Sequence, residues 1–231
     1  MTCTHPLDRP VWASLTTHHE PFAAGGPLAR RYRAEYNVFA GQADESPEAL
    51  AALGALVGPG EQVCIAQAMP VTVPAGLRVH KSLQGVQLTA PAALEVPEGA
   101  EPLLVLTERD APEMFALAHL TEPGPFAPRT HALGRFLGIR IDGRLAAMAG
   151  ERFRLPGYTE VSAVCTHPDF RGRGFARRLT AAVTAAIHQR GERAFLQAWK
   201  TNTPAITLYQ SLGFKIRAEM NVRVLVRATS D

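Results

Sequence analysis

The clearest chemical pattern is the run VCTHPDFRGRGFA at residues 164–176. An apolar strand is predicted to end there, and a glycine-rich turn leads directly into a helix. The first turn of a helix presents N–H groups without intrahelical acceptors and carries a partial positive charge, so it attracts phosphate oxygens. Gly172 and Gly174 let the backbone approach a ligand closely, and Arg171 and Arg173 add positive charge beside it. The run therefore predicts a phosphate-bearing ligand.

Two common phosphate-binding motifs do not fit this turn. A Walker A loop ends in Gly-Lys-Ser/Thr, and no such ending follows. A dinucleotide-binding GxGxxG would need glycine at position 177, where the chain has Arg177. The predicted strand also comes late in the chain instead of opening a βαβ unit. An ordinary tight turn remains the alternative while the first run is taken alone.

A second run, NTPAITLYQSLGF at residues 202–214, favours a cofactor-binding turn over an ordinary tight turn. Together the two runs resemble the GNAT superfamily of N-acetyltransferases, and the resemblance covers about residues 103–227. Three positions fit the Arg/Gln-x-x-Gly-x-Gly/Ala pattern that holds the cofactor pyrophosphate in this family: Arg171, Gly174 and Ala176. The second run matches the family's other cofactor block at Asn202, Ala205, Leu208, Tyr209 and the Leu-Gly-Phe ending at 212–214.

The resemblance implies that the chain binds acetyl-CoA. The backbone of residues 164–166 would pair with the pantetheine arm, and the amides of residues 173–176 would hold the pyrophosphate. Asn202 would hydrogen-bond the arm or a nearby water. The implied cofactor-binding residues are Val164, Cys165, Thr166, Arg171, Gly172, Arg173, Gly174, Phe175, Ala176, Asn202 and Tyr209.

The reaction implied is direct attack of an amine on the thioester, without an acyl-enzyme. The amine must lose a proton before or during attack, which requires a base. The family often places a carboxylate near the start of the fourth core strand, where Glu160 lies. Tyr209 resembles the residue that protonates the departing thiolate, and a phenol of reference pKa about 10 suits a thiol of about 8.5 to 9. Backbone N–H groups of the same strand would stabilise the oxyanion.

Simpler interpretations of these residues stay open. Tyr209 shares an apolar helix face with Ala205 and Leu212, so it could be ordinary core. Glu160 could be a solvent-exposed carboxylate at a strand end. Cys165 is expected to be a small buried residue and not an acyl-carrying thiol.

The elements that position these residues can be predicted from apolar periodicity and turn signals. A helix is expected from Asp110 toward His119, with Asp110 and Glu113 at capping-box spacing. A later helix should have Thr203 as its N-cap. Strands are expected at 103–107, 135–141, 145–153, 160–166, 194–199 and 214–224, and further helices at 175–190 and 204–212. The order β-α-β-β-β-α-β-α-β predicts an α/β fold with a mixed central sheet flanked by helices, as in the GNAT fold.

The N-terminal part is less regular. A Pro- and Gly-rich stretch at 91–102 predicts a connector between an N-terminal α/β part, 1–100, and a GNAT domain, 101–231. A helix is expected at 46–57 and strands at 62–68 and 86–88. The N-terminal part could be a degenerate second GNAT copy, a substrate lid or a dimerisation domain.

Composition limits the remaining function classes. With 46% hydrophobic and 19% charged residues and a net charge of +3, the chain has an ordinary globular composition and no polybasic signature of a nucleic-acid binder. No metal site is predicted, because the histidines and the three cysteines lack ligand spacing. No apolar run is long enough for a membrane span, and a cytoplasmic location is expected.

The expected function is acetyl (or short acyl) transfer to the primary amine of a small molecule or amino acid. A non-catalytic acyl-CoA-binding sensor or scaffold is the alternative, and a homodimer is compatible with the sequence. Acceptor and acyl length stay open.

Overall fold

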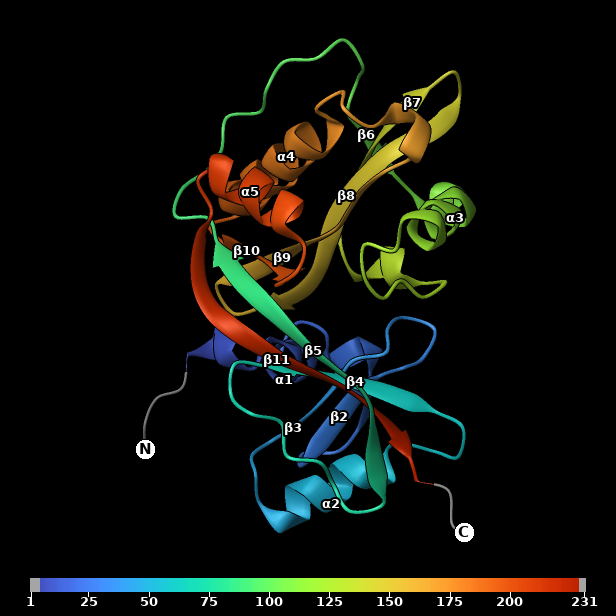
Figure 1. Cartoon of the computed structure of the whole chain (residues 1–231), viewed down its shortest axis with the longest axis vertical. Helices are drawn as coiled ribbons and strands as arrows, with labels where there is room; N and C mark the ends of the chain where they lie inside the picture. Colours follow the sequence, from blue (N-terminus) through green and yellow to red (C-terminus); the bar gives the residue numbers. More distant parts are fainter. Residues whose placement is uncertain (1–4, 229–231) are drawn as a thin grey trace.

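A mixed eight-stranded sheet forms the centre of the molecule (Figure 1). The computed structural model describes residues 5–228. All neighbouring strands run antiparallel except β9 and β10, which are parallel. The spatial order is β4 (Gln62–Gln67), β11 (Lys215–Arg227), β5 (Leu77–Thr89), β10 (Arg193–Trp199), β9 (Tyr158–Thr166), β8 (Arg144–Leu155), β7 (Phe136–Ile141) and β6 (Leu104–Leu106).

Helices cover both faces of the sheet. One face packs against α4 (Phe175–Gln189) and α5 (Thr203–Ser211), and the other against α3 (Ala111–Thr121). The alternation of strand side chains explains this, since Leu137 joins the core under α4 whereas its neighbour Phe136 joins the core under α3. The predicted α/β fold with a mixed sheet flanked by helices is therefore confirmed.

The N-terminal part adds smaller elements below this sheet (Figure 1). A separate antiparallel sheet contains β1 (Ala23–Gly25), β2 (Ala29–Tyr32) and β3 (Ala40–Gln42), and it packs near α1 (Pro10–Leu15) and α2 (Pro47–Ala55). Short 3-10 helices are η1 (Pro6–Asp8), η2 (Glu20–Phe22), η3 (Glu108–Asp110), η4 (Thr130–Leu133) and η5 (Pro168–Phe170).

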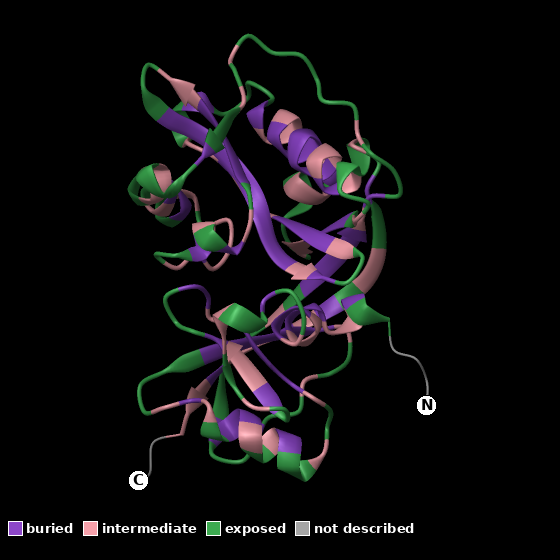
Figure 2. Ribbon diagram, turned by 180° about the vertical axis from the view of Figure 1, so that it is seen from behind, coloured by how far each residue is buried: buried purple, intermediate pink, exposed green. Residues whose placement is uncertain are grey.

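Strands from the N-terminal part enter the main sheet. β5 lies between β10 and β11, and β4 pairs with the far edge of β11. The connector at 91–102 has no regular structure and is largely exposed, as the green upper loop of Figure 2 shows. The two predicted parts therefore share one sheet. The boundary at residue 100, and the hypothesis of a degenerate second copy, stay predictions.

Most predicted elements are present with ends shifted by a few residues, and two predicted caps differ from the expectation. Asn202, and not Thr203, is the N-cap of α5, because its side chain accepts the Ala205 N–H. Asp110 occupies the N-cap position of α3, but its side chain makes no capping hydrogen bond to this helix. Its carboxylate accepts the Thr107 N–H at η3 and also pairs with Arg140.

The predicted alternation of the last strand holds only in its middle. Met220 and Val222 are buried as expected, whereas Ile216 is 51% exposed. A register shift lies between Ile216 and Ala218, and another between Val224 and Leu225. The first shift leaves Arg217 of β11 unpaired and exchanges the two faces of that strand, whereas the second leaves His80 of β5 unpaired. A strict period of two represents neither.

No helix among residues 5–228 is long and apolar enough to cross a membrane.

Candidate active site

The two parallel strands at the centre of the sheet separate after a short stretch of pairing. Only three residue pairs join β9 to β10 within residues 5–228, and the last is Phe195 with Glu160. Beyond that point β10 continues along β5, and residues 161–166 of β9 present a free backbone edge. Unpaired N–H and C=O groups on a strand edge can bind an extended ligand. Residues 164–166, whose backbone was expected to pair with the pantetheine arm, lie on this free edge.

A bulge in β9 lies beside this opening. Met148 pairs with Cys165 and Gly150 with Ser162, so two residues of β9, Ala163 and Val164, face one residue of β8. Ala163 has a positive φ of 51°, which is uncommon for a residue with a side chain. Bulges re-aim backbone groups next to functional sites. Here the re-aimed residues line the opening.

The glycine-rich turn has the geometry of an anion site. Gly172 and Gly174 have φ values of 79° and 77°, which favour glycine, and Gly174 is the N-cap of α4. The first backbone bond of this helix runs from Arg178 N–H to Gly174 O, and no acceptor within residues 5–228 meets the amides of residues 172–177. These free amides stand at the positive end of a 15-residue helix.

A cavity of about 430 Å³ joins the strand edge to this turn. All eleven residues predicted to bind the cofactor line it, namely Val164, Cys165, Thr166, Arg171, Gly172, Arg173, Gly174, Phe175, Ala176, Asn202 and Tyr209. Phe175 packs into the core, so it offers only its backbone. Burial raises the pKa of the Cys165 thiol to about 11, which leaves the sulfur protonated and weakly nucleophilic at neutral pH.

Tyr209 and Asn202 stand where this cavity meets a second one of about 120 Å³. Both residues line both cavities, as do Val164 and Trp199. Tyr209 is 8% exposed, and burial raises the pKa of its phenol to about 12. Asn202 uses its Oδ1 to cap α5, which leaves its Nδ2 available to the cavities.

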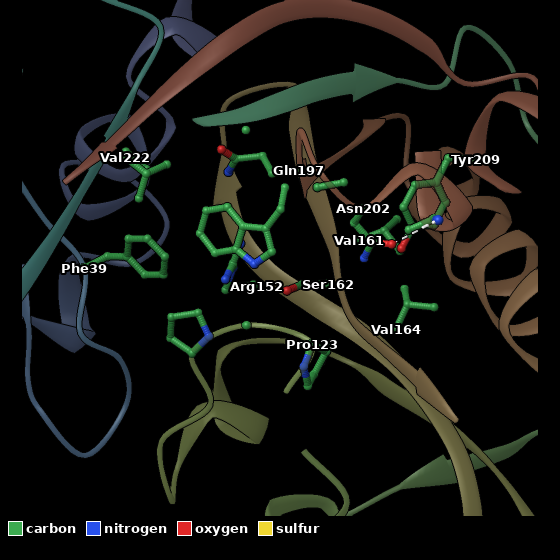
Figure 3. Close-up of a pocket in the computed structure, with 18 residues that line it drawn as sticks. Phe39, Pro123, Arg152, Val161, Ser162, Val164, Gln197, Asn202, Tyr209 and Val222 are labelled. Carbon is green, nitrogen blue, oxygen red and sulfur yellow. Dashed lines mark hydrogen bonds between the residues drawn. The ribbon is translucent and has the colours of Figure 1, made fainter. Parts of the chain in front are cut away.

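The second cavity lies between the separated strands and the N-terminal part. Figure 3 shows Tyr209, Asn202 and Val164 toward one end and Phe39 and Val222 toward the other. Its further lining residues include Pro123, Gly124, Pro125, Arg152, Ser162, Gln197, Ala66 and Gly85. The two cavities together form a passage through the opening between β9 and β10.

Glu160, predicted as the base, has a different environment. It is fully buried and lines neither cavity. Its carboxylate accepts two hydrogen bonds from Arg152, at 2.7 and 2.8 Å, and one from Gln197 at 2.9 Å. A carboxylate held this way cannot reach an amine in the cavity. The role of base stays a prediction that this geometry disfavours, because the acid holds Arg152 in place and lines neither cavity.

Sequence analysis missed Arg152 and Glu122. Arg152 lines the second cavity, and its sequence context does not set it apart, because Glu151 and Arg154 are charged neighbours on the same strand. Glu122 lines the larger cavity after the end of α3, with φ at 48°. Nothing in its sequence context distinguishes it from an ordinary loop carboxylate.

Comparison with known proteins agrees with this geometry. The model of the FR47-like protein family matches residues 136–224. A solved structure from Novosphingobium aromaticivorans, assigned to the GNAT family of acetyltransferases, is 43% identical, with a TM-score of 0.90 over 98% of this chain and 100% of its own. A search of curated proteins found no match.

More distant structures share the fold. A GCN5-related N-acetyltransferase from Kribbella flavida is 20% identical, with a TM-score of 0.61 over 90% of this chain and 89% of its own. A tandem GNAT protein from the clavulanic acid pathway is 14% identical, with a TM-score of 0.54 over 80% and 69%. The 43% identity over nearly the whole length is decisive, and the chain belongs to the GNAT family of acetyltransferases.

Proposed function

We propose that the chain transfers an acetyl or short acyl group from acetyl-CoA to a primary amine of a small molecule or amino acid. The observation that carries this proposal is the passage through the sheet, with free phosphate-binding amides at one end and a separate cavity at the other. An acyl-CoA sensor needs only the first half of this passage. The second cavity favours an enzyme because it provides space for an acceptor beside the thioester.

The larger cavity fits the diphosphate and pantetheine of the coenzyme. The amides of residues 172–177 would hold the diphosphate, with Arg171 and Arg173 adding charge-assisted contacts. The free edge at residues 164–166 would pair with the amides of the arm. When bound, acetyl-CoA supplies an activated acetyl thioester.

Tyr209 is our candidate for the general acid. It stands at the junction of the cavities, and its phenol stays protonated at neutral pH because burial raises its pKa to about 12. A thiolate formed in the same poorly solvated place also has a raised proton affinity, which keeps the transfer favourable. The re-aimed backbone at Ala163 and Val164 is our candidate for stabilising the oxyanion.

Glu122 is our candidate for receiving the amine proton through water. Within residues 5–228 it is the acidic side chain that lines either cavity, whereas Glu160 is committed to Arg152. Proton acceptance through one water is compatible with an exposed carboxylate near the cavity mouth.

The direct test combines calorimetry with a CoA-release assay. We expect heat of binding with CoA and acetyl-CoA, and CoA release with some members of a panel of amino acids, amino acid amides, polyamines and aminoglycosides. Binding without release across the panel would favour the sensor. The absence of binding in well-folded protein would remove both functions.

A further inference from the structure

Arg152 is a buried cation on the wall of the acceptor cavity. It is 9% exposed, and its guanidinium lies 5.0 Å from the ring centre of Phe39 and 4.6 Å from that of Phe153. Nε and Nη2 both donate to Glu160. The rings and the carboxylate together fix the plane of the guanidinium, and Figure 3 shows Arg152 beside Ser162 at the cavity.

The third nitrogen of the guanidinium is left without a partner. Nη1 makes no hydrogen bond within residues 5–228, although the side chain is nine-tenths buried. It points toward the loop that lines the cavity, since a Cβ built on Gly124 would lie 3.9 Å from it. The side chain is largely buried, but Nη1 still reaches the cavity surface, so a ligand oxygen there can accept its N–H groups.

The charges around Nη1 determine whether a charged or a neutral ligand oxygen is favoured there. Glu160 already neutralises Arg152, and the pair as a whole carries no net charge. An incoming carboxylate would place a second buried negative charge beside Glu160. A neutral carbonyl oxygen accepts the same two N–H groups without that repulsion.

The rest of the cavity disfavours polycationic acceptors. No Asp or Glu lines it, so a second ammonium group would find no counter-charge. Apolar and aromatic side chains form part of its wall, with Phe39, Pro123, Trp199 and Val222 among them. Such walls suit the hydrocarbon part of a small acceptor.

Resting on the function proposed above, we infer that the acceptor is an amine carrying a neutral amide carbonyl, which binds Nη1 of Arg152. An amino acid amide has this chemistry, whereas a simple alkylamine or a polyamine lacks it. Gln197 assists as a positioning residue, because its Nε2 donates to the Glu160 carboxylate that holds Arg152.

The test compares leucine amide with isopentylamine, which differs by lacking the carboxamide, and with leucine. Trp199 lines the cavity, so quenching of tryptophan fluorescence reports binding in the presence of CoA, independently of turnover. CoA release gives kcat and KM in parallel. Leucine amide should bind the wild type at least about tenfold more tightly than isopentylamine, as for a hydrogen bond to a charged donor.

The informative variant is Arg152→Lys, which keeps the charge beside Glu160 but loses the guanidinium fork. This variant should bind leucine amide about tenfold or more weakly, with the loss mainly in Kd and KM. Its affinity for isopentylamine should change by less than about twofold. Arg154→Lys is the matched control. Arg154 is on the same strand and pairs with Glu192 at 2.6 Å, but it lines neither cavity, so this variant should bind both ligands as the wild type does.

Two results would overturn the inference. One is equal binding of leucine amide and isopentylamine by the wild type, which needs no variant to fold. The other is tighter binding of leucine than of leucine amide, which would assign a carboxylate to Arg152. If CoA release is absent with every amine while the amide preference persists and Arg152→Lys removes it, the proposed enzyme function fails and the recognition by Arg152 stands.

Discussion

At the residue scale, the proposed chemistry depends on two buried side chains, one that stays neutral and one that forms an ion pair. Tyr209 is buried without an ionic partner, so its phenol keeps its proton, and burial raises the pKa to about 12. Glu160 is buried against Arg152, and the pair compensates both charges. The first arrangement suits a residue that gives a proton during a reaction. The second suits a residue that holds another in place.

Tyr209→Phe removes the proposed acid and little else, because the ring still packs against Phe214. We expect kcat to fall by about 100-fold or more, as for loss of a general acid, with the Kd of acetyl-CoA nearly unchanged. Steady-state CoA release and calorimetry measure the two quantities. A variant that keeps its full rate would return Tyr209 to the role of ordinary core.

The pH dependence of the wild type follows from the same burial. The protonated phenol is the active form, and its pKa is raised to about 12, so activity from this group is present below that pH and lost as pH rises through it. We therefore expect no alkaline fall of kcat assignable to Tyr209 between pH 7 and about 10. A pH–rate profile of kcat with a saturating amine checks this. A descending limb near pH 9 that Tyr209→Phe abolishes would contradict it.

Glu160→Gln should act mainly on stability. The substitution leaves the buried Arg152 without its counter-charge, which costs about 3 to 5 kcal/mol when a buried ion pair is broken. Glu219→Gln is the control, because Glu219 pairs with Lys200 on the exposed surface, where a pair contributes about 1 kcal/mol or less. Urea unfolding of both variants gives the comparison. Equal losses of unfolding free energy would mean that the buried Arg152–Glu160 pair contributes no more to stability than the exposed pair.

At the scale of elements, the site is made by an interruption in regular structure. Two parallel strands part after three residue pairs, a bulge re-aims one of them, and a helix begins on a left-handed glycine. Each interruption frees backbone groups that an unbroken sheet or helix would use internally. The proposed cofactor cavity therefore contains free main-chain groups, and the backbone conformations of its residues matter as well as their side chains.

Gly174→Ala tests the turn. A Cβ there meets nothing within 4 Å, so its cost is the left-handed conformation alone, about 1 to 2 kcal/mol. Gly143→Ala in the β7–β8 turn has φ of 78° and equally open space, and it lies outside both cavities. We expect similar losses of stability from both variants, but about tenfold weaker CoA binding only from Gly174→Ala. Equal CoA affinities would argue against the turn as the diphosphate site.

Elements of this kind are largely predictable from sequence, whereas the acceptor side is not. The helix after residue 174 and the turn at residues 142–143 follow from local glycine and apolar patterns, and every predicted cofactor residue lines one cavity. Arg152 and Phe39 are 113 positions apart in the chain, and nothing local indicates that they meet. The register shifts between β11 and β5 also depend on pairing with a segment that is distant in the sequence.

At the scale of the whole molecule, the sheet joins the two predicted parts of the chain. β5 separates β10 from β11 and forms the longest pairing in the sheet with β11, while Phe39 and Ala66 line the second cavity. The N-terminal part therefore supports the sheet, and under the proposed function it also forms part of the wall around the acceptor. Its removal would expose the edges of β10 and β11 and the apolar face around Phe195 and Val222.

A fragment of residues 101–231 should accordingly fail to fold by itself, although it holds every predicted cofactor residue. Without β5, β10 and β11 lose the strand that pairs with both, and no other described segment bridges them. We expect thermal unfolding followed by circular dichroism to show a cooperative transition for the full chain and none for the fragment. Supplying residues 1–100 as a separate chain should restore the transition and CoA binding, because pairing needs the strand and not its covalent link. A fragment that unfolds cooperatively and binds CoA would instead establish residues 101–231 as an independent domain, with β5 as an addition to a sheet that closes without it.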